Sequence, residues 1–364
     1  MQASRYSGTG EKALFNKGPQ SKSIQGDCDM KEAYLFEPRE DKKVQCMLCS
    51  HRCIIKPGAK GICGVRQNLD GKLFSLVYEK VIARHVDPIE KKPLFHFLPG
   101  TLSYSVATVG CNFRCRFCQN ADISQMPHDS NRIIGESISP EALASDAERT
   151  GCATIAYTYT EPTVYFELAK DTAEIAASKG IKNVFVTNGY MTRECLELIY
   201  PNLHAANVDL KSFSDKFYKE LCNARLQPVL DTIVMMKKQG VWVEVTTLII
   251  PGRNDSPQEL REIARFLADL DPDIPWHVSR FHPTYRLTDV PPTPPRTVRM
   301  ARDIGYEAGL HYVYTGNLPG DEGEHTKCHQ CGAPLIDRFG FYVRNNRVKD
   351  NKCPSCGIPI PGVW

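Results

Sequence analysis

The chain has 364 residues, enough for one large domain with smaller modules or for two domains. Its formal net charge of +3 gives no electrostatic basis for binding nucleic acid or a membrane surface, so we expect neither as a partner. No apolar run approaches the ~18 residues that span a bilayer, and the N-terminus lacks the apolar core of a signal peptide. We therefore expect a cytoplasmic protein.

The first part of the chain divides into a polar stretch and a cysteine-rich stretch. Residues 1–43 are polar and irregular, and we expect them to be partly mobile. A cysteine-rich N-terminal module is expected over 44–100. Its segment 86–100, VDPIEKKPLFHFLPG, is interpreted either as a charged surface loop or as a lid before the first barrel strand, and we assign it no catalytic role.

Fifteen cysteines are unusual for a chain in a reducing compartment, where clustered cysteines are more often metal ligands than disulfides. Eleven fall into three groups, and the first has the spacing Cys-x2-Cys-x3-Cys-x9-Cys. This spacing is compatible with a structural zinc and with an auxiliary iron–sulfur cluster. Its four candidate ligands are Cys46, Cys49, Cys53 and Cys63. The ungrouped cysteines are expected to be small buried side chains or surface thiols: Cys28, Cys152, Cys195 and Cys222.

Residues 101–318 alternate short apolar runs with helix-like stretches in units of ~30 residues, which predicts a parallel sheet, open or closed into a barrel. The expected strands span 103–109, 154–158, 183–187, 206–210, 241–250 and 277–281, with a strand-like run at 311–314. The expected helices span 140–150, 164–179, 193–198, 227–239 and 257–270. Ser139 and Ser256 are expected to cap two of them, the second with Glu259 as its capping-box partner.

The second cysteine group lies in GCNFRCRFCQN, directly after the first expected strand of this sheet. Cys111, Cys115 and Cys118 are one ligand short of the four that zinc or an ordinary iron–sulfur cluster takes. Three thiolates hold three irons of a [4Fe–4S] cluster and leave the fourth iron open for the amino and carboxylate groups of S-adenosylmethionine. The alternative is a zinc site completed by His128. The position after a strand and the aromatic Phe117 favour the cluster.

Four further motifs accompany this one between residues 86 and 255: VDPIEKKPLFHFLPG, YTEPT, NVDLKS and LIIPGRND. With them the chain resembles radical S-adenosylmethionine (radical SAM) enzymes related to pyruvate formate-lyase activating enzymes, and most closely the radical SAM component of the AmmeMemoRadiSam system. The resemblance implies a partial (β/α)6 TIM-like barrel and reductive cleavage of S-adenosylmethionine to methionine and a 5'-deoxyadenosyl radical. That radical abstracts hydrogen from a small-molecule or protein substrate. The implied redox partner is a flavodoxin- or ferredoxin-type reductant.

The resemblance also implies contacts to S-adenosylmethionine. YTEPT lies where relatives carry a Gly-Gly-Glu-Pro-like loop that binds the methionyl ammonium, which assigns this role to Glu161. Tyr159 and Thr160 replace the two glycines, with Thr160 still expected at the cofactor. The alternative for Glu161 is a surface position on the first turn of the next helix. Thr187 and Asn188, at the end of the third strand, lie where relatives contact the methionyl carboxylate or the ribose.

Later strands supply the other implied contacts. Asp209 and Lys211 share one face of their strand, which favours a mutual ion pair or contact with the sulfonium substrate. Leu248 is expected against the adenine ring, and Thr246 stands where relatives often carry an arginine that this chain lacks. His282 matches a ribose-contacting histidine, although a core histidine is an alternative there.

The third cysteine group lies in a module expected over 319–364. Two Cys-x2-Cys turns, each followed by glycine, flank a predicted hairpin at 339–347, which favours a structural zinc ribbon over rubredoxin-like iron. The ligands are Cys328, Cys331, Cys353 and Cys356. Two other functions stay open for the whole chain: activation of a glycyl-radical enzyme, and a non-catalytic zinc-binding adaptor.

Overall fold

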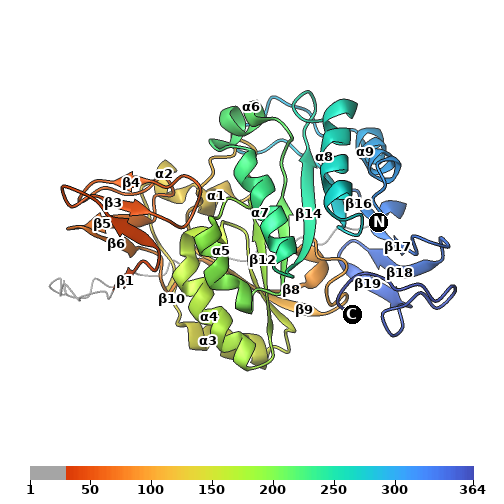
Figure 1. The fold of residues 1–364 in the computed structure, drawn as a ribbon, viewed down its shortest axis with the longest axis horizontal. Helices are drawn as coiled ribbons and strands as arrows, with labels where there is room; N and C mark the ends of the chain where they lie inside the picture. The colour runs from red at the N-terminus through yellow and green to blue at the C-terminus, as the bar shows by residue number, and fades with distance from the viewer. Residues whose placement is uncertain (1–29) are drawn as a thin grey trace, which may run out of the picture.

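The computed structural model describes residues 30–364, so Cys28 and most of the polar N-terminal stretch lie outside it. An eight-stranded sheet with its helices occupies the middle of the molecule (Figure 1). Small β-rich modules lie at the two ends of the long axis, the N-terminal module at one end and the C-terminal module at the other. No helix among the described residues is long and apolar enough to cross a membrane.

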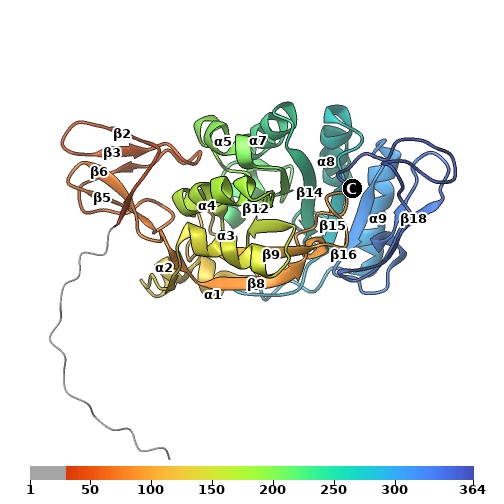
Figure 2. The ribbon, with the colours of Figure 1, turned by 90° about the horizontal axis from the view of Figure 1, so that it is seen from below.

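The N-terminal module consists of two small antiparallel sheets (Figure 2). One has the order β1 (Lys31–Glu32), β6 (Lys72–Ser75) and β5 (Arg66–Leu69). The other has the order β2 (Phe36–Pro38), β3 (Val44–Cys46) and β4 (Ile54–Ile55). Strands β1 and β2 come from the stretch before residue 44, so part of that stretch pairs with the cysteine-rich module. A further antiparallel pair joins β7 (Lys80–Val81) to β10 (Glu136–Ser137).

The central sheet is parallel in seven of its eight strands, which confirms the predicted β/α series. Along the sheet these strands follow chain order, and β8 pairs antiparallel with β9 at one edge. The strands are β8 (Ala83–Pro88), β9 (Leu102–Ala107), β11 (Thr154–Tyr157), β12 (Lys182–Thr187), β13 (Ala205–Asp209), β14 (Trp242–Ile249), β15 (Trp276–Arg280) and β16 (Val313–Gly316). All predicted strands are present. The finer prediction, a partial (β/α)6 barrel, stays a prediction.

Helices follow the parallel strands as the apolar periodicity predicts. They are α3 (Pro140–Arg149), α4 (Phe166–Ser178), α5 (Arg193–Ile199), α7 (Gln227–Lys238), α8 (Pro257–Leu270) and α9 (Pro295–Glu307). Shorter turns are η1 (Ile89–Lys91), α1 (Ala121–Ser124), α2 (Met126–Asp129), η2 (Pro162–Tyr165), η3 (Tyr200–Asn202), α6 (Asp215–Phe217), η4 (Tyr218–Cys222) and η5 (Glu322–Glu324). In α8, Leu260, Ile263, Ala264 and Leu267 are buried at helical spacing.

The predicted helix caps are present, with one difference. The Ser139 and Ser256 hydroxyls accept hydrogen bonds from Ala142 N and Glu259 N. The Glu259 carboxylate does not complete a capping box, because it accepts hydrogen bonds from the Ser212 hydroxyl and from Phe213 N in the loop after β13. It therefore fixes the loop that follows the Asp-Leu-Lys motif.

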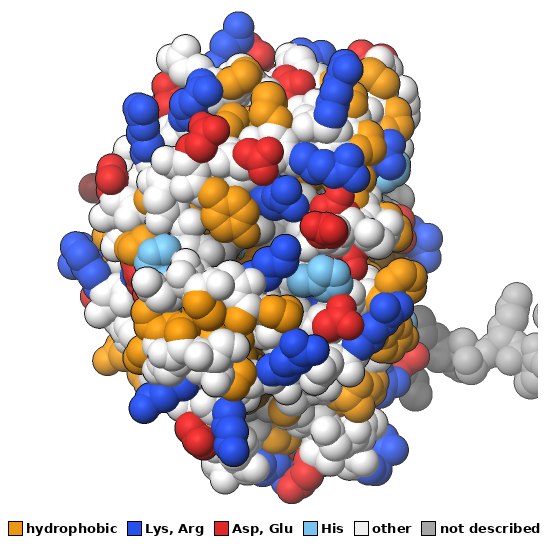
Figure 3. Space-filling view, turned by 90° about the vertical axis from the view of Figure 1, so that its right-hand side faces the viewer, with side chains coloured by type: hydrophobic (Ala, Val, Ile, Leu, Met, Phe, Trp, Pro, Cys, Tyr) orange, Lys and Arg blue, Asp and Glu red, His pale blue; other side chains and the backbone are white. Residues whose placement is uncertain are grey.

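The C-terminal module contains β17 (Thr326–Lys327), β18 (Pro334–Phe339) and β19 (Tyr342–Asn346) in one antiparallel sheet. A hairpin is present between the third group's two Cys-x2-Cys turns, but its first strand, β18, begins before the predicted segment 339–347. On the face that includes this end of the molecule, basic and acidic side chains are interspersed rather than gathered by sign (Figure 3).

Segment 86–100 is part of the interior, and its interpretation as a charged surface loop is wrong. Glu90 and Lys92 are 1% exposed and His96 is 0% exposed. The charges of Lys92 and Glu90 are paired inside the protein: Lys92 Nζ lies 2.7 Å from Asp87 Oδ2, and the Glu90 carboxylate lies beside the buried Arg338 of the C-terminal module. The segment therefore holds the central sheet and the C-terminal module together.

His96 makes this junction sensitive to acid. Burial lowers the pKa of His96 to about 4, although Glu244 opposes the shift. Its ring nitrogens lie 2.7 Å from Pro361 O and 2.5 Å from the Tyr314 hydroxyl. The folded pKa is depressed, so between about pH 6.5 and pH 4 only the unfolded histidine takes up a proton, and stability falls as the pH falls.

We expect the titration of His96 to lower the free energy of unfolding by about 3 kcal/mol as the pH falls from about 6.5 to about 4. The variant His96→Gln does not titrate and should lose less stability on acidification. Denaturant unfolding of both proteins at pH 7 and pH 4.5 measures the difference. An identical pH dependence in the two proteins would contradict the assignment.

Candidate active site

The central cysteine loop leaves the carboxyl end of β9, as predicted. Gly110 begins it with φ +100°, and a Cβ there would lie 2.6 Å from Val65 Cγ1 of the N-terminal module, so glycine permits the close approach. Phe113 N donates a hydrogen bond to Cys111 Sγ over 3.3 Å, and Cys118 Sγ lies 3.2 Å from Ser124 Oγ. The three thiols therefore lie on a packed loop at the end of the sheet where parallel β/α proteins carry out chemistry.

The spacing of these sulfurs fits a cluster better than a single ion. Among the described residues, the only cysteine group with all its sulfurs within 4.8 Å of one another is the C-terminal one. Cys111, Cys115 and Cys118 are farther apart, as expected when each thiolate binds a different iron. His128 does not join them in a close ligand group, and its Nδ1 lies 3.2 Å from Arg114 Nη2. The donor set fits a three-cysteine [4Fe–4S] cluster.

Glu161 is buried beside the cysteine loop rather than exposed on a helix. Its Oε1 accepts hydrogen bonds from Thr163 N, Thr163 Oγ1 and Thr187 Oγ1, and its Oε2 accepts one from Asn188 N over 2.8 Å. Burial raises the pKa of Glu161, and these donors oppose the rise. Burial and the Glu161 charge together raise the pKa of Cys111. Since Oε2 has a single protein donor, it retains capacity for another.

Asn188 links this carboxylate to the cysteine loop. Its Nδ2 donates to Asn112 Oδ1 over 2.7 Å and lies 3.8 Å from Cys111 Sγ. Its backbone N–H is the donor to Glu161 already described. The predicted residues Glu161, Thr187 and Asn188 are therefore brought together with Cys111 in one hydrogen-bonded group.

Asp209 and Lys211 form the mutual ion pair that the sequence allowed, with 2.9 Å between Lys211 Nζ and Asp209 Oδ2. Burial opposes a charged lysine, yet the Asp209 carboxylate and neighbouring thiols raise the pKa of Lys211. One of those thiols is Cys115. The Lys211 ammonium also lies 5.9 Å from the centre of the Phe117 ring, so the pair borders the cysteine loop.

The other residues predicted to contact S-adenosylmethionine lie in different surroundings and do not form one hydrogen-bonded group. Phe117 is buried and packs against Phe217, whereas the Thr160 hydroxyl donates to Thr108 O over 2.9 Å. Leu248 is half-buried on β14. His282 is exposed after β15, so its interpretation as a core histidine is wrong.

Two features of the site were missed from the sequence. Cys222, at the end of η4, lies beside Cys115, and a hydrogen bond from Cys222 lowers the pKa of Cys115. Tyr159 adopts φ +67°, a conformation that suits the glycine carried by relatives at this position. Its hydroxyl donates to Asp87 Oδ2 over 2.6 Å, which explains how tyrosine is held there. No sequence pattern signals either contact, because the partners are far apart in the chain.

The two other cysteine groups differ in geometry. In the C-terminal group, 3.7 Å separates Cys328 Sγ from Cys356 Sγ and Cys331 Sγ from Cys353 Sγ. Gly332 and Gly357 after the two turns have φ +72° and +77°, as tight Cys-x2-Cys turns require. The N-terminal four instead surround a cavity against the central sheet.

Comparisons with known proteins agree with this geometry. Residues 105–267 match the family described as the radical SAM superfamily. An uncharacterized protein of Methanocaldococcus jannaschii is 49% identical over 91% of this chain and 99% of its own length. A putative glycyl-radical enzyme activating enzyme of the same organism is 24% identical over 49% of this chain and 66% of its own length. GTP 3',8-cyclase of Aquifex aeolicus is 27% identical over 44% of this chain and 50% of its own length.

Two solved structures are also similar in part. A domain of pyruvate-formate lyase-activating enzyme from Bacteroides vulgatus matches 44% of this chain and 98% of its own, with 19% identity and a TM-score of 0.40. Streptococcus suis SuiB bound to S-adenosylmethionine matches 62% of this chain and 52% of its own, with 16% identity and a TM-score of 0.47.

An α/β sheet with three cysteines at the end of its first parallel strand defines a class of enzymes that use a [4Fe–4S] cluster and S-adenosylmethionine. Residues 105–267 of this chain match that class, the radical SAM superfamily, and the chain is similar to a putative glycyl-radical enzyme activating enzyme.

Proposed function

We propose that this protein reductively cleaves S-adenosylmethionine and directs the resulting radical to a small-molecule or protein substrate. The carrying observation is the cysteine loop at the end of β9, with its sulfurs spaced for separate irons and Glu161 hydrogen-bonded beside it. When bound, the cluster would supply one electron that splits S-adenosylmethionine into methionine and a 5'-deoxyadenosyl radical. The partial barrel and the narrower AmmeMemoRadiSam assignment are parts of the same proposal.

The chain's own residues then have distinct tasks. Cys111, Cys115 and Cys118 would hold three irons and leave the fourth to the methionyl amino and carboxylate groups. Glu161 Oε2, which has one protein donor, would accept a hydrogen bond from the ammonium. The ion pair of Asp209 and Lys211 keeps two charges at the end of β13 without a net charge beside the sulfonium.

We propose one structural zinc in the C-terminal module. Zinc binds thiolates at about 2.3 Å, which places the sulfurs of a tetrahedral site about 3.8 Å apart. The 3.7 Å separations of the two sulfur pairs in the structure match that value. Such a closed site leaves no open position, so its role would be to fold the module that packs on segment 86–100.

The substrate and partners remain proposals. Relatives include a putative activator of a glycyl-radical enzyme and a GTP cyclase, so the superfamily resemblance supports both a protein and a small-molecule substrate. We propose a flavodoxin or ferredoxin as electron donor, and neither nucleic acid nor a membrane as partner.

Turnover of S-adenosylmethionine tests the function directly. We expect anaerobically reconstituted protein, reduced with dithionite, to form methionine and deoxyadenosine in equal amounts. S-adenosylmethionine should also change the electron paramagnetic resonance spectrum of the reduced cluster, because it binds the open iron. Iron-free protein that holds only zinc after reconstitution would instead identify a zinc-binding adaptor. A glycyl doublet on a co-purified partner would indicate activation, and a modified metabolite would indicate small-molecule chemistry.

A further inference from the structure

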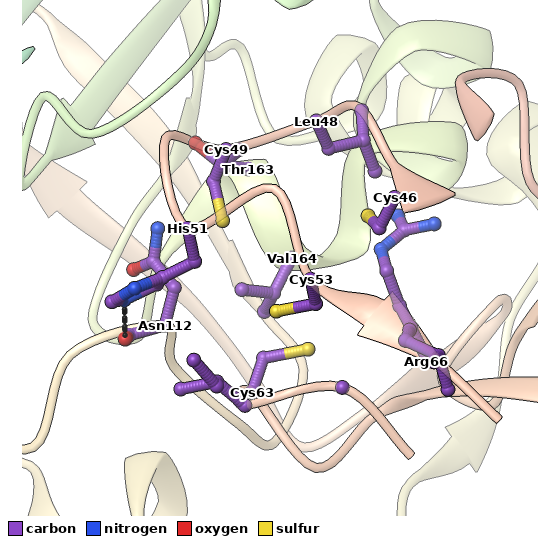
Figure 4. A pocket seen from close by; sticks show the side chains of 13 residues that line it. Cys46, Leu48, Cys49, His51, Cys53, Cys63, Arg66, Asn112, Thr163 and Val164 are labelled. Carbon is purple, nitrogen blue, oxygen red and sulfur yellow. Dashed lines mark hydrogen bonds between the residues drawn. The ribbon is translucent and has the colours of Figure 1, made fainter. Parts of the chain in front are cut away.

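The N-terminal cysteines surround a cavity between the N-terminal module and the central sheet. Cys46 ends β3, Cys49 and Cys53 lie in the loop before β4, and Cys63 precedes β5. Their sulfurs project into the space between these segments (Figure 4). Asn112 of the central cysteine loop forms part of the wall of that space.

The sulfur positions argue against a single zinc ion. Four thiolates that bind zinc close around it, as the C-terminal group does. No three of the N-terminal sulfurs lie within 4.8 Å of one another in the described part of the chain. They border an open space instead, the arrangement needed when each thiolate binds a different corner of an iron–sulfur cube.

Two buried donors on the cavity wall have no protein acceptor. Arg66 Nε and Asn112 Nδ2 are both buried and make no hydrogen bond within the described residues. The side chains are otherwise fixed: Arg66 pairs with Glu167, and Asn112 Oδ1 accepts from Asn188. Buried donors of this kind are costly unless they find acceptors. The cysteine thiolates can accept such hydrogen bonds with either metal, but a cluster adds inorganic sulfides as further acceptors, whereas a zinc ion adds none.

We propose that Cys46, Cys49, Cys53 and Cys63 bind a second [4Fe–4S] cluster whose four irons are all held by protein. Because no iron is open, this site does not bind a substrate and is suited to electron transfer. It would accept one electron from a low-potential flavodoxin- or ferredoxin-type donor and pass one electron on, with no bond made or broken. The proposal that a second cluster binds here depends only on the cavity and its cysteines. The proposal that this cluster relays electrons depends on the function proposed above.

The position of the cavity supports the relay role. Cys49 and Cys53 are partly exposed, whereas Cys46 and Cys63 are buried. On the inner side, Asn112 directly follows Cys111, and His51 Nε2 lies 2.9 Å from Asn112 O. Thr163 and Val164, from the turn after Glu161, also line the cavity. The site therefore extends from the surface to residues that border the central cysteine loop.

Metal analysis of full-length variants tests the proposal. We expect the wild type, reconstituted anaerobically, to hold about eight irons and one zinc. The variant C111A/C115A/C118A should keep about four irons, about four sulfides and the zinc, with a reduced spectrum that S-adenosylmethionine does not change. The reciprocal variant C49S/C53S should lose half of the wild-type iron and keep the S-adenosylmethionine-sensitive signal. If either variant fails to fold, the iron and zinc count of the other and of the wild type still decides the question.

Two outcomes separate this site from the active site. About two zincs in wild-type protein, with no iron in C111A/C115A/C118A, would overturn the second cluster and leave the proposed function standing. Retention of all wild-type iron in C111A/C115A/C118A would refute the central cluster and leave the second one standing. C353S/C356S is the control for zinc, since it should lose the zinc and keep the signals of both iron–sulfur clusters.

Discussion

Replacing Cys115 by alanine is expected to abolish deoxyadenosine formation, and replacing Cys111 or Cys118 should do the same. Each thiolate holds a different iron, and a cube left with two ligands has no protein group to take the missing place except a neighbouring thiol. Cys222 is that neighbour at Cys115, so the combined variant C111A/C115A/C118A is the decisive one. Deoxyadenosine released from S-adenosylmethionine under dithionite is the measured quantity.

A matched control comes from a cysteine outside the three groups. Cys152 is buried just before β11, and its sulfur lies 3.4 Å from Thr150 Oγ1, away from the carboxyl ends of the strands. Cys152→Ala removes an equally buried thiol and should leave deoxyadenosine formation within about twofold of wild type, since its contacts are local. Deoxyadenosine made by the triple variant at the rate of this control would refute the proposed function.

The positions of strands and helices were predictable because their signals are local. Runs of β-branched residues marked β12 and β14, and serine caps marked the starts of α3 and α8. The cysteine motif was predictable for the same reason, because three ligands lie within eight residues of one another. Local patterns also predicted the hairpin of the C-terminal module, but not where its first strand begins.

Segment 86–100 shows why other features were not predictable. Its alternating charges are typical of a solvated loop, and the sequence cannot show that they are paired in the interior. Asp87 accepts from Lys92 and from Tyr159, and Glu244 of β14 accepts from the backbone N–H of Phe95. Such partners meet only after the sheet has formed, so no spacing rule reveals them.

The metal that each cysteine group binds was also not predictable from the sequence. The spacings of the N-terminal and C-terminal groups both allowed zinc, and ligand identity alone does not separate zinc from a cluster. What separates them is the distance between sulfurs, which depends on how β3, β4 and β5 pack against the central sheet. The same packing brings Asn112 to the wall of the N-terminal cavity.

That packing depends on a buried ion pair, and removing one partner should be strongly destabilising. Arg66 on β5 and Glu167 on α4 are 2% and 0% exposed in their side chains, and Arg66 Nη2 lies 2.5 Å from Glu167 Oε2. A second bond joins Arg66 Nη1 to Glu167 Oε1 over 3.1 Å, and Tyr34 N donates to the same oxygen. The pair thus fixes the N-terminal module to the central sheet.

We expect Glu167→Gln to lower the free energy of unfolding by about 3–5 kcal/mol, because it removes the carboxylate that pairs with the buried guanidinium. The same substitution at Glu174, an exposed residue about two turns further along α4, is the matched control. Glu174 pairs with Lys170 near the surface, and Glu174→Gln should cost less than about 1 kcal/mol. Replacing both buried partners, as in R66M/E167L, should cost less than Glu167→Gln because no unpaired charge remains. Denaturant unfolding of the reconstituted proteins under anaerobic conditions measures the free energy of unfolding of all three variants. Equal losses of this free energy for Glu167→Gln and Glu174→Gln would show that the ion pair of Arg66 and Glu167 does not stabilise the junction.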